Sequence, residues 1–272
     1  MIEDCYLNAT ICAAATNGDF EVLAGLLAQV ADLHRGTPSF MANSPALSSA
    51  ARNGHAECVK LLIPFSAPKA LDSAALCSAA HHGHAECVQL LIPFSEPKAD
   101  FSRALRSAAF SGDAECVKLL IPVCNPKARG SLALCWAARR GSIECVKLLI
   151  SVSDPKADDY AAIRMAAAHG HVECVKLLIP GSSPLIEIED APLDALDAGH
   201  ARILSLMLAC EPRILDKVDL FSATEAAIAK GQADLAALLL SIVEQKSIAA
   251  SLALSETALI PEAPSLPRPA RL

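Results

Sequence analysis

The sequence predicts an all-α fold, a helical repeat solenoid of about eight helix-turn-helix units. A segment of the type GHAECVKLLIP returns five times at a fixed spacing of 29 residues. A constant period between about 20 and 50 residues is typical of stacked repeats. The composition agrees, because 53% of the residues are hydrophobic but only 4% are aromatic. Small apolar side chains favour closely packed helices.

Each repeat is marked by a glycine and, four residues later, a cysteine. The five pairs are Gly54 and Cys58, Gly83 and Cys87, Gly112 and Cys116, Gly141 and Cys145, and Gly170 and Cys174. Divergent copies centre on Gly18, Gly199 and Gly231, as expected of the atypical ends that repeat arrays need. The predicted solenoid covers 1–250, with a capping repeat at 1–43, five near-identical repeats at 44–187 and two divergent repeats at 188–250.

Within a repeat, the apolar pattern predicts two helices joined by a tight turn. Leu47, Ala50 and Ala51 form one stripe of a first helix, which Gly54 can end in a left-handed conformation. We expect this helix to be capped by Ser44, Ser73, Ser102 and Ser131 in successive copies. The second helix carries E-C-V-K-L-L-I, and prolines disfavour helix in the residue before them. We expect it to stop at Pro64, Pro93, Pro122 and Pro180.

The segment 44–63, SPALSSAARNGHAECVKLLI, resembles the ankyrin repeat pattern T-P-L-H-x-A-A-x-x-G-H-x-E-(V/I)-V-K-L-L-L. The resemblance is close over residues 44–184 and looser on both sides. Ankyrin repeats have about 33 residues, whereas these have 29. The four missing residues fall where the family carries a β-hairpin finger. The resemblance therefore implies the family's helix pair with a shortened finger.

The same resemblance implies a non-catalytic protein–protein interaction module that binds through a concave groove. Ankyrin proteins of this kind occur as signalling adaptors and as bacterial effectors. We expect no enzyme activity and no cofactor, since the chain has no G-x-G-x-x-G, Walker or G-x-S-x-G motif. The formal charge of −7 argues against nucleic acid or a membrane surface as the partner. We expect a cytoplasmic monomer, translocated into a host cell if it is an effector.

An alternative function uses the eleven cysteines and the histidines for redox or metal responses. Against it, the position of the repeated cysteine holds Val22, Ile203 and Leu235 in the divergent copies, which indicates a core position. The histidine after each glycine is expected to pack on the turn, although His81, His82 and His84 form a dense cluster. The best candidates for exposed thiols are Cys12, Cys77 and Cys135, six residues before their glycines.

The copies differ most on one face of the first helix. Positions nine, six, five, two and one before the glycine lie opposite the apolar stripe, and we call their surface the groove face. Arginine, tryptophan, phenylalanine and methionine, which are enriched at the centres of interfaces, gather on this face together with histidines. Because this basic and aromatic face belongs to an acidic protein, we expect its partner to be an acidic protein segment. The predicted contact residues are Arg52, Asn53, His81, His82, Arg106, Phe110, Ser111, Trp136, Arg139, Arg140, Arg164, Met165 and His169.

The last residues, 251–272, lose the repeat pattern and are rich in proline. We expect a disordered tail. Pro261, Pro264 and Pro267 are spaced by three and followed by Arg268, which suits recognition by an SH3-like domain.

Overall fold

A computed structural model describes residues 2–33, 45–182, 190–210, 213 and 218–258. These residues form sixteen α-helices in eight consecutive pairs, and none of them lies in a β-strand. The chain divides into two compact units, residues 1–214 and 215–272. The last helix pair therefore forms a unit of its own, whereas the sequence predicted one solenoid to residue 250.

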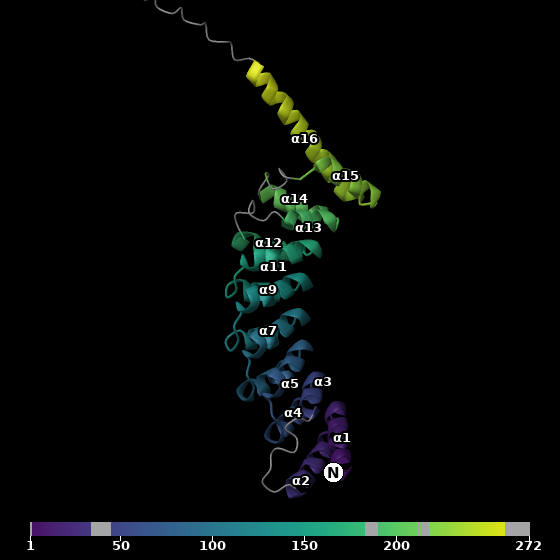
Figure 1. Cartoon of the computed structure of the whole chain (residues 1–272), viewed down its shortest axis with the longest axis vertical. Coiled ribbons are helices and arrows are strands. Elements are labelled where there is room, and N and C mark those ends of the chain that lie inside the picture. Colours follow the sequence, from purple (N-terminus) through teal and green to yellow (C-terminus); the bar gives the residue numbers. More distant parts are fainter. Residues whose placement is uncertain (1, 34–44, 183–189, 211–212, 214–217, 259–272) are drawn as a thin grey trace, which may run out of the picture. The chain divides into compact units, whose positions relative to one another are not determined.

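The first unit contains seven helix pairs. Their bounds are α1 (Ile2–Asn17), α2 (Phe20–Leu33), α3 (Ala46–Asn53), α4 (Ala56–Leu62), α5 (Ala70–His81), α6 (Ala85–Leu91), α7 (Ala99–Ser111), α8 (Ala114–Leu120), α9 (Ala128–Arg140), α10 (Ile143–Ile150), α11 (Ala157–Ala168), α12 (Val172–Ser182), α13 (Asp190–Asp197) and α14 (Ala201–Cys210). The first helices contact one another in order, from α1 against α3 to α11 against α13 (Figure 1). The second helices form a parallel series beside them.

The core between these two layers repeats with the sequence. Leu76, Leu105, Leu134 and Ile163 lie 29 residues apart and are fully buried in successive first helices. Burial of such a side chain stabilises the fold by about 1.5–3 kcal/mol. The predicted apolar stripe is confirmed, because Leu47, Ala50 and Ala51 are also buried.

The turn glycines adopt the left-handed conformation that the sequence predicted, with φ of 78° at Gly54. The histidine of the next repeat packs over this turn, and its Nε2 lies 2.9 Å from the carbonyl oxygen of Arg52. The same contact recurs where His55 meets Thr16, His171 meets Arg139 and His200 meets Ala168. The recurring histidines thus join neighbouring repeats, and each donates from Nε2 in the tautomer that carries hydrogen on that nitrogen.

The repeated cysteines fill a core position, as predicted. Cys87, Cys116 and Cys145 are fully buried, and burial raises the pKa of the Cys87 thiol to about 11. Ile203 and Leu235 are buried at the same position, but Val22 is 52% exposed, so the expectation was wrong there. The position lies against the preceding helix pair, as the proximity of Cys58 to Asp19 indicates. Val22 belongs to the first pair of the chain.

The expectation that serines cap the first helices was wrong. Ser73, Ser102 and Ser131 lie inside left-handed turns, three residues after the helices begin, with φ near 60°. Each is buried, and each Oγ accepts a hydrogen bond at 2.8 Å from a loop N–H 23 residues later, on Glu96, Asn125 and Asp154 respectively. These serines hold the loop of a repeat against the start of its first helix. Ser44 lies outside the described residues.

The short loops contact one another through single side chains. The Cys124 thiol donates to the carbonyl of Pro97 at 3.1 Å, and the Ser153 hydroxyl donates to that of Pro126 at 3.5 Å. The expectation that prolines stop the second helices holds at three of the four positions. Pro64 and Pro93 lie in 3₁₀ turns, η2 (Ile63–Phe65) and η3 (Ile92–Phe94), and Pro122 lies two residues after the end of α8. Pro180 instead lies within the last turn of α12, because proline's fixed φ is itself compatible with helix.

The second unit consists of α15 (Leu220–Ala229) and α16 (Ala233–Ala258). Asp219 caps α15 by accepting hydrogen bonds from the N–H groups of Phe221 and Ser222. α16 continues to Ala258, into the segment 251–272 for which the sequence predicted a disordered tail. The prolines proposed for an SH3-like partner lie outside the described residues. None of the described helices has the length and apolar character needed to cross a membrane.

Candidate functional site: the groove face of the first helices

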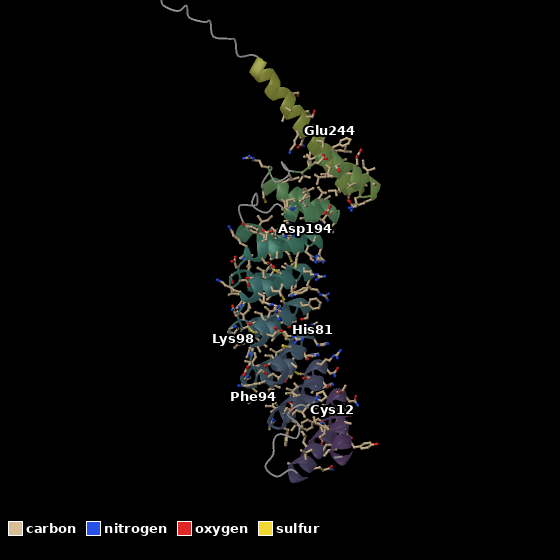
Figure 2. The ribbon with its side chains drawn as sticks, in the orientation of Figure 1. Cys12, His81, Phe94, Lys98, Asp194 and Glu244 are labelled. Atoms are coloured by element: carbon tan, nitrogen blue, oxygen red, sulfur yellow. The ribbon has the colours of Figure 1, made fainter. Side chains whose placement is uncertain are left out.

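The groove face extends over α3, α5, α7, α9 and α11. Positions two before the glycine are exposed in four consecutive repeats, at Arg52, His81, Phe110 and Arg139. Figure 2 shows His81 on one side of the helix stack and Phe94 and Lys98 on the opposite side. Asn53, His82, Arg140 and His169 are also exposed, whereas Ser111, Trp136 and Met165 are half-buried.

Five of the predicted residues form a continuous series of ring and cation contacts, which we call the aromatic ladder. His81 stacks on Phe110 with ring centroids 5.5 Å apart, and Phe110 meets the edge of Trp136 at 5.3 Å. The guanidinium of Arg139 lies 5.1 Å from the Trp136 ring, and its Nε donates to His169 Nε2 at 3.3 Å. The ladder therefore joins four repeats, from α5 to α11.

The ladder holds Trp136 in one orientation before any partner arrives. Edge-to-face aromatic pairs contribute about 0.5–1.5 kcal/mol beyond burial, and an exposed cation–π contact adds about 0.5–1 kcal/mol. His169 is also fixed, because its Nδ1 lies 3.0 Å from the Met165 carbonyl. Side chains that are already ordered lose less entropy when they bind.

A pocket of about 340 Å³ opens beside the ladder between α3, α5 and α7. We call it the arginine pocket, and its lining residues are Arg52, Ala74, Cys77, Ser78, His81, His82, Arg103 and Ser107. Burial lowers the pKa of His81, and the nearby His82 and Arg52 lower it further. A second pocket of about 410 Å³ shares His81 and His82 and reaches Phe110 and Arg140.

Arg103, Ser78 and Ser107 were missed as contact residues. Arg103 lies nine positions before its glycine and the two serines five before theirs. All three positions belong to the groove face, so the register was a sufficient signal. The convergence of Arg103 with Arg52 across an intervening helix was not visible in the sequence.

Two predicted contact residues, Arg106 and Arg164, form ion pairs with carboxylates of the same chain. The Arg106 side chain is only 11% exposed, and its Nη2 donates to the Asp100 carbonyl at 2.9 Å and to its Oδ2 at 3.2 Å. Arg164 pairs with Asp194 of α13 at 3.1 Å and with Asp159 at 3.6 Å. Position six before the glycine thus faces neighbouring structure, and the expectation that it belongs to the free surface was wrong.

The cysteines at the same position, six before the glycine, are not the exposed thiols that the sequence predicted. Cys77 and Cys135 are buried, and Cys12 is half-buried. Burial raises the pKa of Cys135 to about 11, which disfavours the reactive thiolate. The exposed thiol among the described residues is Cys210. Within the described part of the chain, no three histidine, cysteine or acidic side chains are grouped so that they could hold a metal ion.

Comparison with known proteins agrees with this architecture. A sequence profile for ankyrin repeats (3 copies) matches residues 11–104 and 105–190. The human ASB11 ankyrin repeat domain is similar in structure, with a TM-score of 0.53 and 22% identity over 64% of this chain and 84% of that one. The ankyrin repeat domain of Bcl-3 has a TM-score of 0.50 and 20% identity over 63% and 85%.

A search of curated proteins found no match. The profile match covers more than half of the 272 residues, and the helix pairs, the left-handed turn glycines and the inter-repeat histidines all follow the same repeat. The chain therefore belongs to the ankyrin repeat family.

Proposed function

We propose that this protein is a non-catalytic interaction module whose groove face binds an acidic segment of a protein partner. The observation that carries the proposal is the aromatic ladder, an ordered row that includes the exposed cation of Arg139 above Trp136. Tryptophan, tyrosine and arginine dominate the energetic centres of protein interfaces. The ankyrin family is generally a protein-binding scaffold, which supports the same conclusion.

The distribution of charge favours an acidic partner. On the second helices, two of the four repeated lysines, Lys147 and Lys176, pair with the glutamates three residues before them, each at 2.7 Å. On the groove face, Arg52, Arg139 and Arg140 form no ion pair with a carboxylate of the described residues. A partner that supplies acidic side chains would neutralise these cations. Such complementarity chiefly raises the association rate and the specificity.

The site is a local feature of an acidic chain. The formal charge is −7 over 272 residues, so the whole molecule repels a strongly acidic protein at long range. Binding should therefore depend on ionic strength through the few groove arginines.

The state of the cysteines bears on the compartment. The structure describes the side chains of ten cysteines, and all of them are free thiols. Free thiols suit a reducing compartment, so we place the interaction in the cytoplasm.

The test is affinity capture from the native lysate with three proteins: the parent, a groove variant and a matched control. The groove variant carries Trp136→Ala, Arg139→Glu and Arg140→Glu. The control makes the same changes of charge and aromatic content on the other face, as Phe94→Ala, Lys60→Glu and Lys118→Glu. We expect a partner that the parent and the control retain and the folded groove variant loses. A partner retained by all three would place binding elsewhere.

A further inference from the structure

The arginine pocket differs from the rest of the groove face in its chemistry. Two arginines, two histidines and two serines line it together with Ala74 and Cys77, and none of these eight residues carries a carboxylate. The arginines come from different repeats, Arg52 at the end of α3 and Arg103 near the start of α7. His81 and His82 lie at the end of the intervening α5.

The cations of this pocket are not neutralised within the protein. Neither Arg52 nor Arg103 forms an ion pair with any carboxylate that the structure describes. Burial is the main cause of the lowered pKa of the neighbouring His81, and the charges of His82 and Arg52 lower it further. The pocket thus has a positive potential that a bound anion would offset.

The hydrogen-bonding groups suit an anion with several acceptor atoms. His82 Nδ1 lies 3.0 Å from the Ser78 carbonyl, so this nitrogen carries the hydrogen, and Nε2 donates to an anion only when the imidazole is protonated. The pocket also offers two guanidinium forks and two hydroxyls. A carboxylate has one negative charge and can pair with one fork, whereas a phosphate ester has nearly two charges and three strong acceptor oxygens.

We propose that the arginine pocket binds the phosphate group of a phosphorylated serine or threonine in the partner segment. The inference rests on the proposed function, because it names the chemistry of the segment that the groove face receives. Arg52 and Arg103 clamp the phosphate from two sides, and the imidazoles of His81 and His82 approach it from α5. Recognition by clustered arginines is a general means of reading phosphorylated peptides.

The position of the pocket relative to the ladder sets the spacing of the partner residues. His81 belongs to both, and two ring contacts of 5.5 Å and 5.3 Å lead from it to Trp136. An extended peptide advances about 3.3 Å per residue. The residue that contacts Trp136 should therefore lie at most about three positions from the phosphorylated residue.

The test uses small probes rather than an unidentified partner. The full chain is titrated with N-acetyl-phosphoserine methylamide, and separately with N-acetyl-glutamate methylamide, while the side-chain NMR signals of His81 and His82 are followed. We expect the phosphoserine probe to bind at least tenfold more tightly. Equal affinity for the glutamate probe, or no movement of either histidine signal, overturns the proposal.

A matched pair of variants checks that the arginines act through the pocket. Arg52→Gln with Arg103→Gln removes two charges from the pocket, and Lys60→Gln with Lys118→Gln removes two from the second helices. We expect the first variant to bind the phosphoserine probe at least tenfold more weakly than the parent, and the second to bind it as the parent does. Equal weakening in both variants would indicate a non-specific charge effect and overturn the site. Circular dichroism and urea unfolding verify that both remain folded.

The two proposals can fail separately. If the captured partner is lost by the groove variant but is bound equally after phosphatase treatment, and the probes do not discriminate, the phosphate inference is wrong and groove binding stands. If the phosphoserine probe binds at His81 but the groove variant still captures the partner, the pocket stands and the proposed function is wrong.

Discussion

Substitution of the turn glycines separates backbone strain from the packing of the inter-repeat histidine. At Gly54, with φ of 78°, an added Cβ would lie 2.6 Å from His84 Nδ1. At Gly112, with φ of 83°, the nearest atom would be Ser142 Cβ at an ordinary contact distance of 3.5 Å. Both positions carry the same left-handed backbone, so Gly54→Ala and Gly112→Ala form a matched pair.

The expected magnitudes follow from these distances. A left-handed alanine costs about 1–2 kcal/mol, of which a reduced entropy of the unfolded chain offsets about 0.4–1 kcal/mol. Gly112→Ala should therefore destabilise the protein by about 1 kcal/mol. Gly54→Ala must also displace the His84 ring and break its 2.9 Å contact with the Arg52 carbonyl. The lost hydrogen bond adds about 1 kcal/mol, which gives about 2 kcal/mol in total.

Urea unfolding of the two single variants, of His84→Ala and of the double variant Gly54→Ala with His84→Ala completes the test. The double variant removes the clash, so the two losses should be less than additive by about 1 kcal/mol, as expected of residues in contact. The slope with urea must stay constant, because long repeat arrays can lose two-state behaviour. Equal losses at Gly54 and Gly112, or strict additivity, would refute the packing role of His84.

Three other expectations concern single residues. Ser102→Ala leaves the N–H of Asn125 without its acceptor and should cost about 1–3 kcal/mol in urea unfolding; a loss no larger than that of an exposed serine would contradict it. The pKa of His81 is lower in the folded protein than its ordinary value of 6.5, so as the pH decreases His81 is protonated in the unfolded state before it is protonated in the folded state. The stability of the fold should therefore fall as the pH decreases below 6.5. His81→Gln should reduce this fall, as measured by thermal unfolding at several pH values. In native thiol labelling followed by mass spectrometry, Cys210 should react much faster than Cys87, which is buried with a pKa of about 11; similar rates would show that the repeats open readily.

The repeat period was sufficient to predict the helix pairs, because each unit makes the same contacts with its neighbours. Once Gly54 ends one helix, the 29-residue spacing places every later glycine and every core leucine at an equivalent position. The N-terminal copy shows the limit of this reasoning. Val22 has the same register as the buried cysteines but is 52% exposed, so register alone does not decide burial in this copy.

The errors at the groove face have a different physical origin. A helical wheel treats each helix as isolated, so it assigned Arg106 and Cys135 to a free surface. In the fold, that position turns toward neighbouring structure, where Asp100 holds Arg106 and burial encloses Cys135. The serine caps failed because these hydroxyls accept hydrogen bonds from loop N–H groups 23 residues later, and because the serines lie in left-handed turns that no local propensity indicates.

The aromatic ladder could not be derived from register either. Phe110 lies two positions before its glycine and Trp136 five before the next, so nothing in the repeat pairs them. Their contact depends on the distance between adjacent first helices and on the rotamers that this distance allows. The sequence predicted the five ladder residues as contact residues, but the ring and cation contacts among them required the structure.

The separation of scaffold from site explains why the groove face can differ between otherwise identical repeats. The contacts that join repeats use the residues that recur, such as the histidine after the glycine and the buried cysteine. Replacing buried Leu134 with alanine should cost about 2–5 kcal/mol, because a cavity forms. Removing Trp136, which is half-buried and held by Phe110 and Arg139, forfeits chiefly the energy of those contacts, about 1–2.5 kcal/mol. The repeats can therefore exchange groove residues, and with them the partner chemistry, at a cost in stability that the repeated core tolerates.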